Sequence, residues 1–260
     1  MQNDSIRNIV VNKNKKIKFP IRFGLVQAES NSISQSELVI RNVINNLNQS
    51  FAPVNFLFYL EQIDIIKTDL SLEDLSSNVD NIYDRFSEQN DHDDMITIYV
   101  LNHRDEFCNI QSESISCSRT GGFSYILSER TNNIVVSQFD LKDPKIIAHE
   151  LGHFFGLFHT FEEFNFGKDQ FDSDKCQDVG DRMCDTPPDP GIVFEIYVNY
   201  STCEMIGLKD TIGNEYKPLL ENYMSYYKPC YLRKYSFTED QIMFMQIASM
   251  TPIRKRLSRT

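Results

Sequence analysis

Three of the five histidines of the chain fall within one window of eleven residues, HELGHFFGLFH. His149 and His153 are four residues apart, so in a helix both imidazoles lie on the same face and can reach one metal ion. Glu150 follows the first histidine and can be aimed at a metal-bound water as a general base. The spacing therefore predicts a helix that carries a catalytic metal.

Gly156 indicates where this helix must end. A continuing helix would carry His159 away from the metal, whereas a glycine lets the chain turn sharply with a positive φ. Three neutral imidazoles and a water make an open tetrahedral site, which is typical of catalytic zinc. We expect one zinc ion, held by His149, His153 and His159. A downstream glutamate as third ligand is the alternative, but it would leave Gly156 and His159 without a role.

A methionine farther along the chain extends the pattern. The spacing H-E-x-x-H-x-x-G-x-x-H is typical of metzincin peptidases when a methionine turn follows, and NYMSY supplies Met224. The bare H-E-x-x-H has a competing interpretation, a helix whose histidines face solvent or fill the core. His92 and His103 lie in polar stretches, so we expect them at the surface and not at the metal.

The elements that must hold these residues follow from the apolar patterns. Five strands are predicted, in IKFPIRFGLVQ, NFLFYLEQIDII, MITIYVLN, GGFSYIL and NNIVVSQ. Two helices are predicted between the first three strands, one opened by a capping box at Ser34 and Glu37 and one with apolar positions from Leu75 to Phe86. This alternation predicts a mixed α/β layer with a largely parallel sheet.

Two further helices have clear starts. Asp143 and Pro144 place a capping carboxylate and a first-turn proline before the histidine helix. Thr238 and Gln241 form a capping box for a final helix through IMFMQIASM. Between about 160 and 220 the periodicity gives way to acidic loop segments.

Composition and charge exclude several classes of protein. The chain has 260 residues, of which 41% are hydrophobic, so it can bury a sizeable core. The formal net charge of −11 argues against nucleic acid as a partner, because such binding neutralises phosphates. Basic clusters near both ends are interpreted as solvated tails. No run approaches the roughly 18 apolar residues of a membrane span, and the first twenty residues lack the apolar core of a secretory signal.

Six cysteines favour disulfides and an oxidising compartment. We therefore expect a secreted, extracellular protein whose signal and any pro-segment are absent from this sequence. No C-x-x-C pair supports a zinc ribbon, and free buried thiols are the alternative. Six cysteines permit 15 pairings, between which the spacing does not choose. The disulfide candidates are Cys108, Cys117, Cys176, Cys184, Cys203 and Cys230.

In order along the chain, HELGHFFGLFHTF, GDRMCDTPPDP, NYMSY, Cys230 and the SFTEDQ segment resemble the pappalysin branch of the metzincin metallopeptidases. The resemblance implies a single catalytic domain over residues 1–260. Its zincin fold would be α/β (α+β), with a mixed sheet, backing and active-site helices and an irregular C-terminal subdomain. An upper subdomain would cover about 1–156 and a lower one about 157–260, with a cleft between them.

The resemblance also implies roles for single residues. Glu150 would be general base and acid, Met224 a hydrophobic floor beneath the metal, and Tyr226 a donor to the tetrahedral oxyanion. Core packing is the alternative for Met224 and Tyr226. The implied activity is that of a secreted zinc endopeptidase with protein or peptide substrates, and we expect a monomer.

A second metal and a disulfide pattern are also implied by the resemblance. Calcium is expected near GDRMCDTPPDP, on Asp181, Asp185 and the carbonyl of Thr186, although a solvated acidic loop is the alternative. The implied disulfides are Cys176 to Cys203, Cys184 to Cys230 and Cys108 to Cys117.

The chain departs from its relatives at two positions. Cys184 lies inside the Asp-Thr-Pro motif instead of after it, which weakens the implied pairing. Lys228 stands where relatives that cut before Arg or Lys have an acidic residue just ahead of a cysteine. We therefore expect Lys228 to favour an acidic or neutral side chain after the scissile bond.

Two other functions fit the same residues. A catalytically silent metal-binding or adhesion module would keep the fold without turnover, but the intact Glu150 and Tyr226 count against it. A zinc hydrolase that acts on a small amide would differ in the length of its substrate cleft.

Overall fold

A computed structural model describes residues 16–28, 36–68, 92–101, 106–111, 114–119, 122–124, 126, 132–162, 176–178, 180–228, 230 and 234–259. The helices and short helical turns are α2 (Glu37–Ser50), α5 (Pro144–Phe154), η2 (Ile192–Tyr197), α6 (Glu239–Met250) and α7 (Pro252–Lys255). The strands are β1 (Ile17–Ala28), β2 (Phe56–Thr68), β3 (Ile96–Leu101), β4 (Glu106–Gln111), β5 (Ser114–Arg119), β6 (Gly122–Phe123), β7 (Asn133–Ser137), β8 (Val198–Asn199) and β9 (Glu204–Met205).

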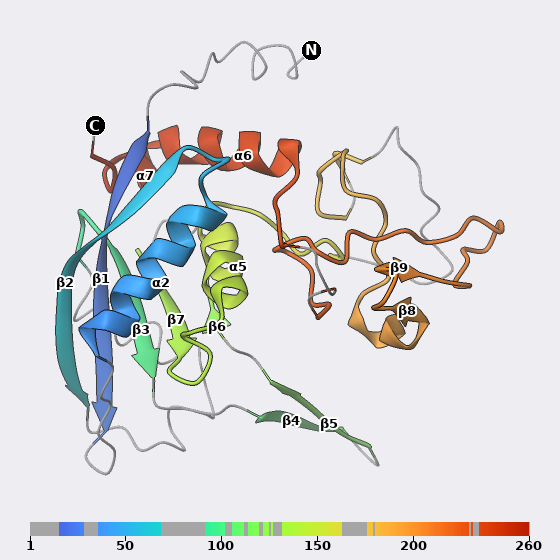
Figure 1. The fold of residues 1–260 in the computed structure, drawn as a ribbon, viewed down its shortest axis with the longest axis horizontal. Helices are drawn as coiled ribbons and strands as arrows, with labels where there is room; N and C mark the ends of the chain where they lie inside the picture. The colour runs from blue at the N-terminus through green and yellow to red at the C-terminus, as the bar shows by residue number, and fades with distance from the viewer. Residues whose placement is uncertain are drawn as a thin grey trace.

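The main sheet has the order β2-β1-β3-β7-β6 (Figure 1). β2, β1, β3 and β7 are parallel, and β6 runs antiparallel to β7 at one edge. All six side chains of β3 are buried, as expected of a strand in the middle of a sheet covered on both faces. The predicted mixed α/β layer with a largely parallel sheet is confirmed.

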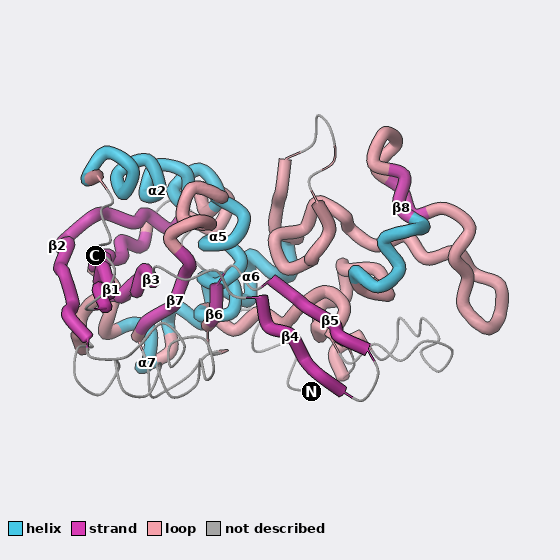
Figure 2. Tube along the Cα trace, turned by 90° about the horizontal axis from the view of Figure 1, so that it is seen from below, coloured by secondary structure: helices cyan, strands magenta, loops and turns pink. Residues whose placement is uncertain are grey.

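Helices α2 and α5 lie over the same face of this sheet, as the view in Figure 2 shows. The predicted apolar stripe of α2 is buried, with Ile40, Val43 and Leu47 in the core. Aromatic rings from β1, β2 and the end of α5 meet beneath it, among them Phe19 and Phe155, whose ring centroids are 5.2 Å apart. This packing fixes the position of α5, and therefore of its histidines, relative to the sheet.

The predicted start of α2 was wrong. The helix begins at Glu37, and its cap is Ser36, whose hydroxyl accepts from the amide of Val39. Glu37 is already the first helical residue, so its carboxylate pairs with Arg41 one turn later and cannot close a capping box with Ser34. The helix expected between Leu75 and Phe86 lies outside the described residues.

The two caps expected later in the chain are confirmed. The side chain of Asp143 accepts from the amide of Lys145, with Pro144 in the first turn of α5. Thr238 and Gln241 form the reciprocal capping box of α6. The hairpin of β4 and β5 was not predicted, and of the strand expected in GGFSYIL the structure assigns only Gly122–Phe123.

Between α5 and α6, the described part of the chain forms only η2 and the two-stranded hairpin β8-β9 as regular elements. The final helices then return to the sheet, because Met245 and Leu257 join the same core as Phe19. The division into subdomains near Gly156 stays a prediction.

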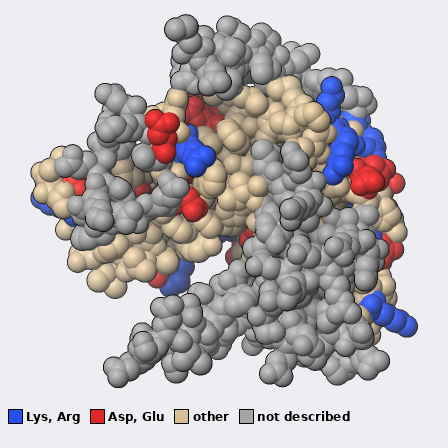
Figure 3. Space-filling view, turned by 180° about the vertical axis from the view of Figure 1, so that it is seen from behind, with Lys and Arg blue, Asp and Glu red and all other residues tan. Residues whose placement is uncertain are grey.

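The described surface mixes both signs of charge. On the face drawn in Figure 3, acidic and basic side chains lie beside one another. Among the described residues, Arg259 pairs with Asp94 at 2.8 Å. None of the helices within the described ranges is long and apolar enough to cross a bilayer.

Candidate metal centre

Helix α5 places the first two histidines and the glutamate. His149, Glu150 and His153 are buried, along with the apolar residues that anchor the helix to the sheet. Burial of so many polar groups on one short helix is costly unless they have partners. The question is therefore which atoms satisfy the two imidazoles.

Each of these imidazoles is oriented by a backbone carbonyl. His149 Nδ1 lies 2.8 Å from the carbonyl oxygen of Tyr223, and His153 Nδ1 lies 2.7 Å from that of Leu157. A carbonyl only accepts hydrogen bonds, so the proton of each ring must be on Nδ1. The Nε2 atom of each ring therefore presents a bare lone pair, the form in which histidine binds a metal.

The Nε2 atoms of all three predicted ligands converge. His153 Nε2 lies 3.0 Å from His149 Nε2 and 3.1 Å from His159 Nε2. Zinc–nitrogen bonds of about 2.0–2.1 Å in a tetrahedron place ligand nitrogens roughly 3.3 Å apart, close to these values. Lone pairs that face one another so closely repel unless a cation lies between them. The donor set thus fits one zinc ion.

His159 reaches this point because the helix ends as expected. Gly156 has a φ of 96°, and the amide of Leu157 bonds back to the carbonyl of Gly152 across the turn. Unlike the other two rings, His159 has a carboxylate at Nδ1, with Glu162 Oε2 at 3.3 Å. A carboxylate behind a ligating imidazole raises its basicity and fixes its orientation. The sequence analysis did not single out Glu162.

Burial keeps the three imidazoles neutral. Desolvation lowers the pKa of His153 and of His159 to about 4, and it lowers the pKa of His149 well below its usual value, with help from the other two rings. Neutral imidazole is the form required of a ligand. The site is therefore ready to bind a cation near neutral pH without first losing protons.

Glu150 is packed against the edge strand of the sheet. A Cβ atom on Gly122 of β6 would lie 2.8 Å from Glu150 Cγ and 2.9 Å from its Oε1. Only a glycine lets the strand come this close. Desolvation raises the pKa of Glu150 to about 8 in the metal-free protein. A cation bound beside it would favour the ionised carboxylate.

Met224 lies directly under the histidine helix. Its side chain is fully buried, and a Cβ atom on Gly152 would lie only 2.4 Å from its sulfur. The preceding residue, Tyr223, supplies the carbonyl that orients His149. The methionine turn thus contacts the helix that carries the first two ligands, and its role as a floor beneath the metal stays a prediction.

Tyr226 lies beside two of the three ligand rings. It is 48% exposed, and its ring centroid lies 5.5 Å from that of His149 and 4.9 Å from that of His159. Partial burial, with the nearby carboxylates of Glu150 and Glu162, raises its pKa to about 12. The phenol is therefore a proton donor in hydrogen bonds at any physiological pH.

Phe161 is a further aromatic neighbour that the sequence analysis missed. Its ring stacks on His159, with centroids 4.7 Å apart and planes 10° apart, and meets Tyr226 edge-on at 4.8 Å. Its position two residues after the third histidine, in HTF, was the one available signal.

The residues proposed for calcium lie in different environments in the structure. Asp181 is buried, and its Oδ1 accepts from the amide of Met183 and the hydroxyl of Thr186, while its Oδ2 has no hydrogen-bond partner. Desolvation raises the pKa of Asp181 to about 7. The exposed Asp185 instead accepts from the amide of Asp240 at the start of α6. A calcium site is not shown.

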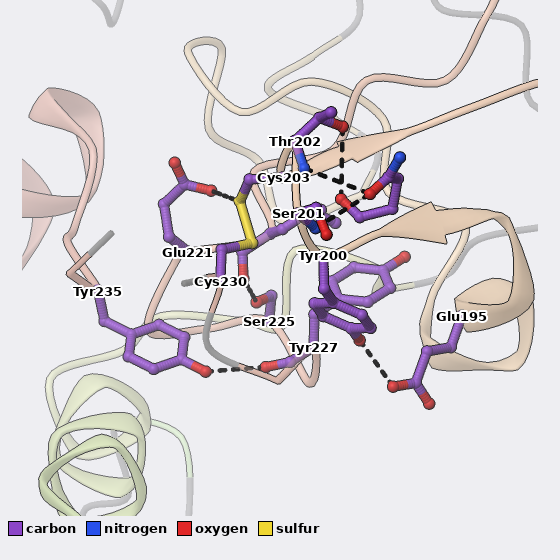
Figure 4. The surroundings of a disulfide bond; sticks show 12 residues. Glu195, Tyr200, Ser201, Thr202, Cys203, Glu221, Ser225, Tyr227, Cys230 and Tyr235 are labelled. Atoms are coloured by element: carbon purple, nitrogen blue, oxygen red, sulfur yellow. Dashed lines mark hydrogen bonds between the residues drawn. A yellow bond between two sulfur atoms is a disulfide. The ribbon is translucent and has the colours of Figure 1, made fainter. Parts of the chain in front are cut away.

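The disulfide pairing implied by the resemblance was wrong for four cysteines. Cys176 is bonded to Cys184, and Cys203 is bonded to Cys230 (Figure 4). The chain turns at Gly180, with a φ of 64°, and so brings Cys184 back to Cys176 with 5.1 Å between their Cα atoms. In the sequence Cys184 directly precedes Asp185, Thr186 and Pro187, so its expected place inside that motif was also wrong.

The structure also bears on the third implied disulfide and on a second cluster of metal-binding atoms. Antiparallel pairing of β4 and β5 sets the backbone of Cys108 opposite Cys117, as a local bridge requires, but their side chains lie outside the described residues. Glu221 lies 3.3 Å from the sulfur of Cys203, which forms a second cluster of metal-binding atoms with Cys230. Because these sulfurs are bonded to each other, they offer no thiolate to a metal.

Lys228 is exposed and paired. Its ammonium lies 3.1 Å from the carboxylate of Glu195, and its side chain is 74% exposed. Glu195 also accepts from the hydroxyl of Tyr200 at 2.6 Å (Figure 4). Part of the positive charge expected at this position is therefore neutralised within the chain.

Comparison with known proteins finds similarity to two families of metallopeptidases. The model of the family described as metallo-peptidase family M12 matches residues 25–188. The model of a second family, described as pregnancy-associated plasma protein-A, matches residues 129–249. No curated protein matches the chain. A solved structure titled "Structure of a chaperone-substrate complex" is similar at 20% identity and a TM-score of 0.35 over 58% of this chain. The match covers 26% of that chain's length, and it is too slight to bear on the fold. The match to metallo-peptidase family M12 extends over more than half of the chain, so the chain belongs to that family of metallopeptidases, and the match over residues 129–249 supports the pappalysin resemblance.

Proposed function

We propose that the protein is a zinc endopeptidase that hydrolyses peptide bonds. The observation that carries this proposal is the convergence of three Nε2 atoms: those of His149 and His159 lie within 3.1 Å of that of His153. The buried carboxylate of Glu150 follows His149 on the same helix. A silent metal-binding module would not require Glu150 to be held against the edge strand or Tyr226 to stand over the ligand rings. Both features favour turnover.

Zinc, when bound by the three histidines, supplies Lewis acidity and makes a water acidic enough to attack near neutral pH. Glu150 accepts a proton from the water while the water oxygen forms a bond to the carbonyl carbon of the substrate. The same carboxyl group then gives that proton to the leaving nitrogen as the carbon–nitrogen bond breaks. Tyr226 donates a hydrogen bond to the oxygen that carries the negative charge in between.

An extended peptide is the substrate that suits the edge of the sheet. β6 is the last strand of the described sheet, and its Gly122 contacts the side chain of Glu150. A peptide that pairs with the outer edge of β6 as an added strand would therefore have its backbone next to the general base. Lys228 would contribute to specificity after the scissile bond, where we expect acidic or neutral side chains.

Calcium is a second proposed ligand. The unpaired and buried Oδ2 of Asp181 supports it, because a carboxylate oxygen without a donor is costly and a hard cation would satisfy it. Two disulfides support the proposal that the protein is secreted and acts outside the cell, and we propose that it acts as a monomer.

Hydrolysis of casein and of quenched-fluorescence peptides by the zinc-loaded protein tests the proposal. We expect cleavage that phenanthroline abolishes and added zinc restores. Glu150→Gln should bind zinc as tightly as the wild type but lose hydrolysis, because the amide cannot accept the proton. Full activity in Glu150→Gln would refute the assigned role, and zinc binding without hydrolysis in the wild type would favour the silent module.

A further inference from the structure

Asp189 is a buried carboxylate to which the zinc pattern assigns no role. It is 1% exposed and lies in the loop after the Asp-Thr-Pro motif. Three donors satisfy it: Thr160 Oγ1 at 2.5 Å on Oδ2, and Tyr227 Oη at 2.8 Å and the amide of Gly191 at 2.9 Å on Oδ1. Burial raises its pKa, while these hydrogen bonds oppose the shift. A carboxyl group so deeply buried and so fully bonded is held in one position.

Two of the three donors are chain neighbours of residues at the metal centre. Thr160 directly follows His159, and Tyr227 directly follows Tyr226. The amide of Thr160 also donates to the carbonyl of Met224 at 3.2 Å, so the two segments touch at the site. One carboxylate therefore links the segment of the third histidine to the segment of the tyrosine.

The third donor braces the aromatic neighbour of the same histidine. Gly191 has a φ of 82°, and a Cβ atom on it would lie 3.5 Å from Phe161. Its backbone thus lies next to Phe161, whose ring stacks on His159 and meets Tyr226 edge-on. By accepting a hydrogen bond from the amide of Gly191, Asp189 also fixes the backbone that lies next to Phe161.

We propose that Asp189 is a positioning residue that sets the placement of His159 and Tyr226 relative to each other, through Thr160, Tyr227 and Gly191. This inference rests on the proposed zinc peptidase function. Outer partners of a metal ligand commonly change metal affinity or activity about 10–100-fold when they are removed. Asp189 acts on the third ligand and on the oxyanion donor at once, so its loss should affect both zinc affinity and turnover.

A compensating cation lies close to this network. Lys145 donates to the carbonyl of Tyr227 at 2.5 Å, and its charge favours the ionised form of Asp189. An asparagine has the same shape but only one acceptor oxygen. Asp189→Asn cannot serve both Thr160 on one side and Tyr227 with Gly191 on the other, so it should release one of the two segments.

The test compares variants by zinc affinity, measured by competition with a chromogenic chelator, and by kcat and KM on a quenched peptide. Asp189→Asn should weaken zinc binding about 10-fold or more and lower kcat about 10–100-fold, with KM changed less than about 3-fold. The d–d spectrum of the cobalt-substituted protein should shift, because the His159 ring turns. A lower melting temperature with unchanged zinc affinity, cobalt spectrum and kcat would overturn the inference.

Single-donor variants separate the two branches and remain informative if Asp189→Asn does not fold. Thr160→Val should weaken zinc binding, and Thr160→Ser, which keeps the hydroxyl, should restore it. Tyr227→Phe should lower kcat in the wild type but have no further effect when Tyr226 is already phenylalanine. Additive losses of kcat in that double variant, or equal zinc affinities for the valine and serine variants, would contradict the inference.

Asn48→Ala is the control for loss of a part-buried polar clamp. Asn48 bonds both backbone groups of Phe58 and so joins α2 to β2, not the segments of Thr160 and Tyr227. We expect lower stability with unchanged zinc affinity. A wild type that binds zinc without hydrolysing peptides would refute the proposed function, and the zinc-affinity comparison would still decide whether Asp189 positions His159.

Discussion

Replacement of Gly122 by alanine tests how closely Glu150 is held. A Cβ atom at Gly122 would lie 2.8 Å from Glu150 Cγ, whereas ordinary contacts begin at 3.4 Å, so the side chain must move by at least about 0.6 Å. The backbone of Gly122 is not left-handed, so alanine is tolerated there without strain. A displacement near 1 Å costs about 100-fold in rate, so we expect kcat to fall about 10–100-fold.

The assay measures kcat, KM, zinc content and melting temperature for Gly122→Ala. Because the atoms that must move belong to a flexible side chain, the melting temperature and zinc content should stay near those of the wild type. Gly24→Ala is the matched control, since its Cβ would lie 2.7 Å from Ile66 and 2.9 Å from Tyr99 inside the sheet. It should lose stability and keep its kcat. Wild-type kcat in Gly122→Ala, or loss of its zinc, would refute the reasoning.

Three other predictions concern stability and metal affinity. Gly152→Ala would overpack Met224 and should lower the free energy of unfolding by about 1–3 kcal/mol; thermal unfolding should show a smaller loss when Met224→Ala is added. The pKa of Asp181 is about 7 in the folded protein and about 4 in the unfolded chain. The protonated carboxyl therefore contributes fully to the free energy of unfolding below pH 4, and this contribution is lost as the pH rises to 7. Denaturant unfolding of the calcium-free protein should show this decline, and Asp181→Asn should lack it. Glu162→Gln removes the charge behind His159 and should weaken zinc binding about 10-fold by chelator competition; an unchanged affinity would contradict a role for that carboxylate.

The zinc helix could be predicted because its chemistry is local. The interval between His149 and His153 is one helical turn, the cap at Asp143 lies in the same segment, and Gly156 marks the end of the helix without reference to the rest of the fold. For this helix, neighbours in sequence decided the structure. The expected place of Met224 came instead from the resemblance of the whole pattern to a known family.

Contacts between distant segments were not predictable in the same way. Asp189 meets Thr160 and Tyr227 across 29 and 38 residues, and a lone Asp in a proline-rich loop gives no sign of either partner. The disulfide of Cys176 depended on a turn at Gly180 that spacing does not reveal. The start of α2 was misplaced for a different reason, because Ser34 and Ser36 were both acceptable caps by residue type.

Zinc X-ray absorption of the metal-loaded protein tests the central claim most directly. We expect three imidazole nitrogens and one oxygen at about 2.0–2.1 Å from the zinc, in the wild type and equally in Glu150→Gln. A sulfur scatterer near 2.3 Å would instead place the metal on a cysteine thiolate, outside the three-histidine site. That result, or fewer than three histidines around the zinc, would contradict the account.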